Sequence, residues 1–211
     1  MNILSIDFDI IMAPDILLYN HLIQGTDANG KNISLQTIAK DFPSLNYCRA
    51  DLGHYQKIFL YLVKIIPYLD VDDIRVSFNH EDIKFILEEA SDAHVFNIDH
   101  HHDLGYYDRP EKRKNDNICS CANWGDYFFR NGTITKFTWL KNVNSDENQE
   151  YKEDPRVEYL DLRDYDLNNL PKFDKLFICL SPEWVSENYF PLFYMILDYI
   201  NKEKNCHLEI H

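Results

Sequence analysis

Apolar residues recur along the chain in two patterns. Short, nearly continuous apolar runs rich in β-branched residues predict buried strands, and longer segments with apolar residues at helical spacing predict helices. The predicted strands cover residues 3–8, 74–79, 94–99, 134–140, 157–162 and 175–180. The predicted helices cover residues 15–24, 54–69, 81–91, 123–131 and 189–203, and the polar stretches 25–53, 105–120 and 144–154 are expected to be loops.

The order of these elements indicates the fold class. Strands and helices alternate, and the helix expected at 81–91 separates two runs that are apolar enough to be buried on both faces. This is typical of a βαβ unit in a parallel sheet. We therefore predict a single three-layer α/β/α domain over residues 1–211, with a mostly parallel sheet. In such sheets ligands bind beyond the carboxyl ends of the strands, so functional side chains are expected there.

Composition and charge narrow the classes of partner. The 211 residues, 45% hydrophobic and 27% charged, have the composition of a globular protein. Asp and Glu number 35 against 21 Lys and Arg, a formal charge of −14, which argues against nucleic-acid and membrane binding and favours cationic ligands. No apolar run approaches the ~20 residues of a membrane span, and the N-terminal residues do not have the pattern of a signal peptide. The chain has five cysteines, an odd number. We expect a reduced, cytoplasmic protein.

Ionisable residues follow three of the predicted strands. They are, in chain order, Asp7, Asp9, His80, Asp99, His100, His101, His102 and Asp103. Because side chains alternate along an extended chain, Asp7 and Asp9 are expected to point the same way. By the same rule Asp99, His101 and Asp103 share one face of their segment, and the other two histidines share the opposite face.

Carboxylates at neighbouring strand ends, ~4.8 Å apart, repel one another unless protons or cations neutralise them. Their mixture with imidazole suits Mn, Fe, Co or Zn better than Ca or Mg. Two such ions ~3.5–4 Å apart can activate a water molecule near neutral pH. Simpler interpretations stay open: the Asp-x-Asp pair as a turn or helix cap, His80 as a structural residue, and the histidine run as a solvated, pH-sensitive cluster.

The same motifs resemble those of the arginase/ureohydrolase family. Asp99-x-His101-x-Asp103 resembles its Asp-Ala-His-x-Asp motif, Ser5-Ile6-Asp7-Phe8-Asp9 resembles its Ser-x-Asp-x-Asp signature, and His80 resembles the histidine of its Gly-Gly-Asp-His signature. The resemblance implies a site for two Mn²⁺ ions in which Asp7 and Asp99 bridge. One ion would also take His80 and Asp103, and the other would take His101 and Asp9.

A second resemblance covers most of the chain. The pattern DHHHD, then Cys-Ala-Asn-Trp, then LFICLSPEW is similar to an arginase-like family that includes peptide arginases, which convert arginine to ornithine within ribosomally made peptides. It implies an arginine-containing precursor peptide as partner and urea as product. In ureohydrolases the Ser-x-Asp-x-Asp strand comes second, whereas here it comes first, which implies a permuted strand order. The Asp-x-Asp-x-x-Asp-Pro continuation is absent. The chain is also shorter than a free-arginine arginase, and a more open mouth would suit a peptide-borne side chain.

The resemblance also suggests individual roles. Asp103 matches the proton-shuttling aspartate of the family. A second carboxylate should bind the guanidinium group bidentately, and Glu183 is the candidate, with helix N-terminal charge compensation as its alternative role. Asn123 and Trp124 are candidates for substrate contact, or else a turn residue and a core residue. Two other functions stay open: a different metal-dependent C–N hydrolase, such as an agmatinase or deacetylase, and a non-catalytic metal-binding module.

Overall fold

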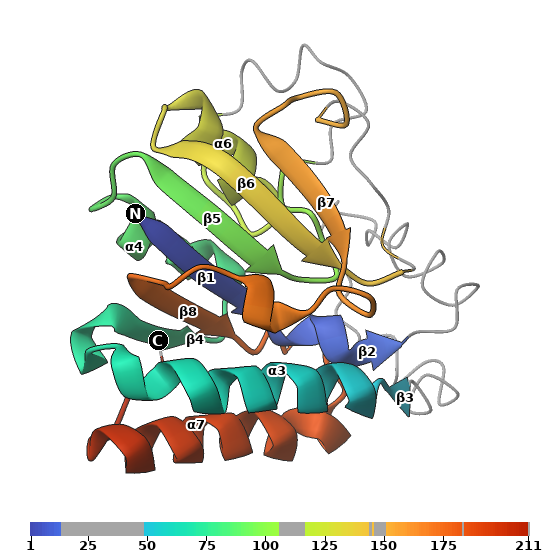
Figure 1. Cartoon of the computed structure of the whole chain (residues 1–211), viewed down its shortest axis with the longest axis vertical. Coiled ribbons are helices and arrows are strands. Elements are labelled where there is room, and N and C mark those ends of the chain that lie inside the picture. Colours follow the sequence, from blue (N-terminus) through green and yellow to red (C-terminus); the bar gives the residue numbers. More distant parts are fainter. Residues whose placement is uncertain (14–48, 106–116, 144, 146–150, 183, 211) are drawn as a thin grey trace, which may run out of the picture.

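Six strands form one sheet in which every pairing is parallel (Figure 1). The computed structural model describes residues 1–13, 49–105, 117–143, 145, 151–182 and 184–210. The strands are β1 (Asn2–Asp7), β4 (Ile74–Ser77), β5 (Ala93–Ile98), β6 (Ile134–Lys141), β7 (Val157–Asp161) and β8 (Lys175–Cys179). Their spatial order is β4-β8-β1-β5-β6-β7. The predicted α/β class is confirmed, and the first strand of the chain lies inside the sheet.

Helices cover both faces of this sheet. Helices α3 (Leu52–Ile65) and α7 (Phe190–Lys204) run side by side along one face, and the shorter α4 (Lys84–Leu87) and α6 (Trp124–Arg130) lie against the other (Figure 1). The 3₁₀ helices are η1 (Phe8–Ile11), η3 (Ile66–Tyr68), η4 (Val71–Asp73), η5 (His80–Ile83), η6 (Leu167–Asn169) and η7 (Glu187–Tyr189). The arrangement is the predicted three-layer α/β/α sandwich.

The largest differences from the predicted boundaries concern two helices. Helix α3 begins at Leu52, before the apolar stripe, because the Asp51 side chain accepts hydrogen bonds from the backbone N–H groups of Gly53 and His54. The helix expected at 81–91 is only η5 followed by one turn of α4. The predicted 25–53 loop is wrong at its described end, which contains β3 (Arg49–Ala50) and the start of α3. Strand β3 pairs antiparallel with the short strand β2 (Met12–Ala13). The helix predicted at 15–24 lies outside the described residues.

The alternation of β1 explains where the chemistry lies. Leu4 and Ile6 pack into the core beneath α3 and α7, whereas Ile3 packs into the core that contains residues of α4 and α6. Side chains alternate along a strand, so Ser5 and Asp7 lie on the same face of the sheet as Ile3, opposite Leu4 and Ile6. Because β1 is an interior strand, Asp7 ends it near the middle of the carboxyl edge, on the side of α6.

Candidate metal centre

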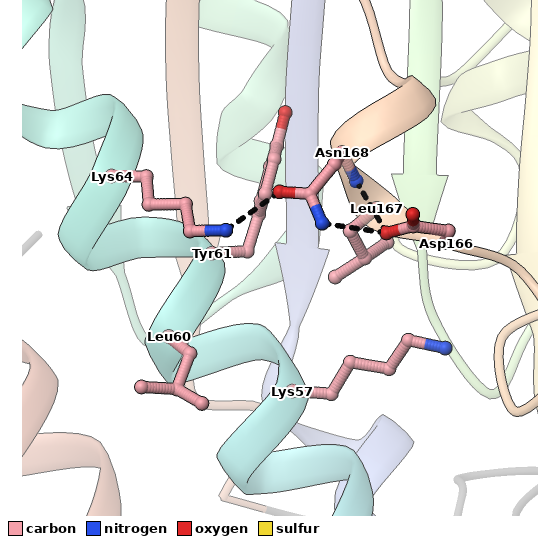
Figure 2. Close-up of a pocket in the computed structure, with 7 residues that line it drawn as sticks. All are labelled: Lys57, Leu60, Tyr61, Lys64, Asp166, Leu167 and Asn168. Atoms are coloured by element: carbon pink, nitrogen blue, oxygen red, sulfur yellow. Dashed lines mark hydrogen bonds between the residues drawn. The ribbon is translucent and has the colours of Figure 1, made fainter.

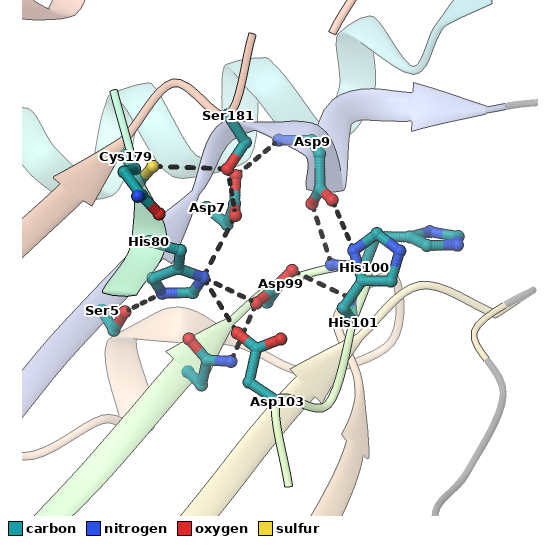
Figure 3. Close-up of polar contacts among 12 residues, drawn as sticks. Ser5, Asp7, Asp9, His80, Asp99, His100, His101, Asp103, Cys179 and Ser181 are labelled. Atoms are coloured by element: carbon teal, nitrogen blue, oxygen red, sulfur yellow. Dashed lines mark hydrogen bonds and ion pairs between the residues drawn. The ribbon is translucent and has the colours of Figure 1, made fainter. Parts of the chain in front are cut away.

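The turns after β1, β4 and β5 bring all six predicted metal ligands together (Figure 3). Strands β1 and β5 are neighbours, but β8 separates β1 from β4. His80 follows β4 and reaches the cluster across β8, where its ring stacks on Phe177 with centroids 5.7 Å apart and planes 5° apart. A flat, apolar residue on the intervening strand thus supports the imidazole.

Three carboxylates converge on one nitrogen atom of His80. Its Nδ1 lies 3.1 Å from Asp7 Oδ2, 3.2 Å from Asp99 Oδ2 and 2.9 Å from Asp103 Oδ2. The other ring nitrogen, Nε2, is 2.8 Å from the hydroxyl of Ser5, which fixes the orientation of the ring. These contacts join side chains from segments that are far apart in the sequence.

Asp99 links this group to a second one. His101 Nδ1 lies 2.7 Å from Asp9 Oδ2, and the backbone N–H of His101 donates to Asp99 Oδ1 at 2.8 Å. The backbone N–H of His100 donates to Asp9 Oδ1 at 3.2 Å. The ligand atoms of Asp9, Asp99 and His101 lie within 4.8 Å of one another. The ligand atoms of Asp7, His80 and Asp99 also lie within 4.8 Å of one another. The cluster therefore consists of two adjoining groups that share one carboxylate.

Strand alternation places Asp7, and the turns at the strand ends bring the other ligands to it. Strand β1 stops at Asp7, whose Oδ1 accepts from the backbone N–H of Asp9 at 3.2 Å and caps η1. Strand β5 stops at Ile98, and Asp103 adopts a left-handed backbone with φ 50°. Such a conformation is unfavourable for a non-glycine residue and persists only where neighbours hold it.

The start of α6 holds Asp103 in that conformation. Trp124 Nε1–H donates to Asp103 Oδ2 at 2.7 Å, and the Gly125 N–H donates to the Asp103 carbonyl oxygen at 2.9 Å. A Cβ atom on Gly125 would lie 3.0 Å from that carbonyl oxygen and 3.0 Å from Leu104 Cδ2. A side chain at this position would therefore be crowded against both atoms. Trp124 is fully buried and its side chain contacts a predicted ligand. Its contact with substrate stays a prediction.

Burial and mutual repulsion raise the pKa of the carboxyl groups. Burial and then the nearby Asp103 and Asp7 raise the pKa of Asp99 to about 7. Burial and then Asp99 raise the pKa of Asp9 to about 6, and burial with Asp9 also raises the pKa of Asp7. These shifts favour the neutral form of the carboxyl groups, as expected where like charges crowd in a buried site.

The pKa values of His80 and His101 are raised, whereas burial ordinarily lowers the pKa of a histidine. Burial alone would lower the pKa of His80, but Asp103 and the hydrogen bonds with Asp7 and Asp99 raise it well above its ordinary value. For His101 the carboxylate of Asp9 likewise outweighs burial, and the pKa is about 9. Protonated imidazoles therefore supply the positive charge that the carboxylates require, in positions where a divalent ion would compete with the protons.

The side chains of the other two histidines of the run, His100 and His102, have lowered pKa values. Burial and the neighbouring His101 lower the pKa of His102 to about 3 and lower that of His100 well below its ordinary value. His102 Nδ1 accepts from the Leu104 N–H at 3.0 Å, and its ring meets Trp139 edge-on. The structure thus separates one face of the run that could bind metal from one that packs.

The donor set fits divalent transition-metal ions. Four carboxylates and two imidazoles, nearly all deeply buried, offer hard oxygen and borderline nitrogen ligands in the mixture that Mn, Fe, Co or Zn accept. The Asp7/His80/Asp99 group and the Asp9/Asp99/His101 group could each hold one ion. Buried charges of one sign need such compensation.

The other predicted site residues have different surroundings. Asn123 Oδ1 accepts from the Ser120 N–H at 2.8 Å and its Nδ2 donates to the Ile118 carbonyl at 3.0 Å, so its side chain holds the turn before α6. Its contact with substrate stays a prediction. Glu183 lies outside the described residues.

Sequence reasoning missed the residues contributed by the turn after β8. Ser181 Oγ–H donates to Asp7 Oδ2 at 2.6 Å, and Cys179 Sγ lies 3.3 Å from Ser181 Oγ. The ring of Trp184 lies 5.2 Å from the ring of His101. Nothing in the sequence shows that β8 inserts between β1 and β4, although the polar and aromatic residues that directly follow this strand were a usable signal.

A separate cavity of about 180 Å³ lies between α3 and η6 (Figure 2). Its lining includes Lys57 and Lys64, but these lysines already donate to protein acceptors. Lys57 Nζ bonds the Leu162 carbonyl at 2.6 Å, and Lys64 Nζ bonds Asn168 Oδ1 at 2.7 Å. The cavity therefore does not present the unsatisfied charge that marks the acidic cluster.

Comparison of the chain with protein-family models, with curated proteins and with solved structures gives no match. Within the described part of the chain, the search for membrane spans finds no helix with the length and apolar character to cross a bilayer.

Proposed function

We propose that the protein is a metal-dependent hydrolase that converts arginine side chains in a peptide to ornithine and releases urea. Two divalent ions, expected to be Mn²⁺, would be held by the six clustered side chains: Asp7, Asp9, His80, Asp99, His101 and Asp103. The observation that carries the proposal is the meeting of three buried carboxylates at the single Nδ1 atom of His80. A second ligand group adjoins it through Asp99.

Guanidinium hydrolysis suits this donor set. The guanidinium carbon is a poor electrophile, and side chains do not readily attack it. When bound, a pair of divalent ions lowers the pKa of water so that it can act as a nucleophile near neutral pH. The reaction adds water across the bond between the guanidinium carbon and the side-chain nitrogen, which must leave as an amine. Asp103, positioned by Trp124, is proposed to carry the proton to that nitrogen.

The electrostatics support a cationic substrate. Four carboxylates share the cluster, and the chain has a formal charge of −14, so the field attracts guanidinium groups. Glu183 is proposed to bind the guanidinium group as a bidentate carboxylate. That the arginine belongs to a precursor peptide is supported by the resemblance of the DHHHD, Cys-Ala-Asn-Trp and LFICLSPEW segments to peptide arginases.

A urea assay tests this proposal. The Mn²⁺-loaded protein is incubated with a peptide containing one internal arginine, and we expect urea together with a peptide of ornithine mass. The Asp99→Asn variant and the same peptide with lysine in place of arginine should give neither. Product from agmatine or from an acetyl-lysine peptide, with none from the arginine peptide, would instead indicate another C–N hydrolase. Bound metal without any product would indicate a binding module.

A further inference from the structure

Solvent reaches the acidic cluster on the side of His101. The side chains of the other five clustered residues are 5% exposed or less, whereas 17% of the His101 side chain is exposed. The ring of Trp184 lies beside it, with centroids 5.2 Å apart and planes inclined by 55°. Trp184 is itself half-buried. An aromatic side chain therefore borders the exposed side of the cluster.

The turn that carries Trp184 is tied directly to the cluster. The N–H groups of Trp184 and Val185 both donate to the Ser181 carbonyl, at 2.9 and 3.2 Å, and Val185 is fully buried. Ser181 has a left-handed backbone with φ 47°, and its hydroxyl donates to Asp7 Oδ2 at 2.6 Å. The same turn thus orients a carboxylate of the cluster and places the indole at its border.

Trp184 differs from the other two tryptophans of the chain. Trp124 and Trp139 are fully buried, and their Nε1–H groups donate to Asp103 Oδ2 and to the Asp99 carbonyl oxygen. Those two indoles support the site from inside. The partly exposed indole of Trp184 is available to a molecule that approaches His101.

We infer that Trp184 determines substrate specificity by receiving the planar cation of the substrate at the entrance to the acidic cluster. This inference rests on the proposed hydrolysis of guanidinium groups. A guanidinium group is planar and weakly hydrated, so it stacks on an indole face by cation–π attraction. The carboxylates of the acidic cluster add an electrostatic attraction for the guanidinium group, which a neutral side chain of the same shape lacks. The contact should change affinity by about 2- to 30-fold.

Binding to the Mn²⁺-loaded protein is measured by isothermal titration calorimetry, which does not depend on the indole that is replaced. The probe is N-acetyl-argininamide, and the neutral N-acetyl-citrullinamide is its matched comparison. We expect the arginine probe to bind, and the citrulline probe to bind at least several-fold more weakly. In the Trp184→Leu variant the arginine affinity should fall by about 2- to 30-fold, and Trp184→Phe should retain part of it. A Tyr68→Leu control removes a 90% exposed aromatic in η3, which follows α3, and should change nothing.

The kinetics of urea release separate this inference from the proposed function. Trp184→Leu should raise KM with little change in kcat, and its Mn²⁺ affinity should stay that of the wild type. The inference would be overturned if KM and probe affinity stayed unchanged, or if the two probes bound equally. A loss confined to Mn²⁺ affinity would also overturn it, because Trp184 would then only position His101. Selective binding of the arginine probe without urea from any substrate would overturn the proposed hydrolysis and leave the cation contact standing.

Discussion

Replacing Asp99 by asparagine should stabilise the metal-free protein at alkaline pH while abolishing its stabilisation by metal. Asp99 is fully buried and belongs to both ligand groups. Its pKa rises from an ordinary 3.8 to about 7 through burial and the repulsion of Asp103 and Asp7. The folded metal-free state therefore binds a proton that the unfolded chain releases. The stability from this proton is fully present below about pH 4 and is lost as the pH rises through about 7.

The size of the effect follows from these two pKa values. Between pH 5 and pH 8, a carboxyl group with a pKa of 3.8 unfolded and about 7 folded loses roughly 2 to 3 kcal/mol of its contribution to the free energy of unfolding. The Asp99→Asn variant cannot ionise at this position and should lack that loss. Part of the gain is offset because Asp99 accepts from the Asn97 side chain and from the His101 N–H, and an amide can accept well from only one of them.

Urea denaturation of chelator-treated protein, followed by circular dichroism at pH 5 and pH 8, measures this difference between wild type and variant. Saturating Mn²⁺ at pH 8 should then stabilise the wild type, by ~2.7 kcal/mol at 100 times the dissociation constant, and leave the variant unchanged. Equal pH dependence of the two metal-free proteins would refute the assigned pKa. Equal stabilisation by Mn²⁺ would refute the role of Asp99 as a shared ligand.

Three further predictions concern the same centre. Trp124→Phe keeps the buried ring but removes the N–H that orients Asp103, so Mn²⁺ affinity measured by titration should fall about 10- to 100-fold with the fold retained. Gly125→Ala places a methyl group 3.0 Å from the Asp103 carbonyl oxygen and should lower the free energy of unfolding by about 1 to 3 kcal/mol. Unchanged denaturation curves would contradict the crowding at this position. Mn²⁺ affinity should rise with pH, and binding should release protons into a weakly buffered solution. The reason is that Asp9 and Asp99, with pKa values of about 6 and 7, must lose protons to bind metal. An affinity independent of pH would contradict this prediction.

Much of the fold could be predicted because its signals are local. A strand buried on both faces needs a continuous apolar run, and the run before Asp7 identified β1 to within one residue at each end. The run that ends near Asp99 identified β5 in the same way. Ionisable residues directly after two such runs indicated the acidic cluster, since parallel strands end at one edge of the sheet.

The contacts that complete the site depend on the strand order, which local patterns do not contain. The insertion of β8 between β1 and β4 brings Ser181 to Asp7 and Trp184 to His101. It also lets His80 reach the cluster from a strand that is not adjacent to β1. A tryptophan that bonds a buried carboxylate has the same local pattern as one that fills the core, so the hydrogen bond of Trp124 could not be inferred from the sequence.

We propose that six side chains from three segments bind two divalent ions. Anomalous diffraction at the manganese absorption edge, from a crystal grown with Mn²⁺, tests this proposal most directly. We expect two anomalous peaks ~3.5–4 Å apart, with Asp7 and Asp99 between them, His80 bound to one ion and His101 to the other. Peaks elsewhere, or no peak within bonding distance of Asp99, would contradict it.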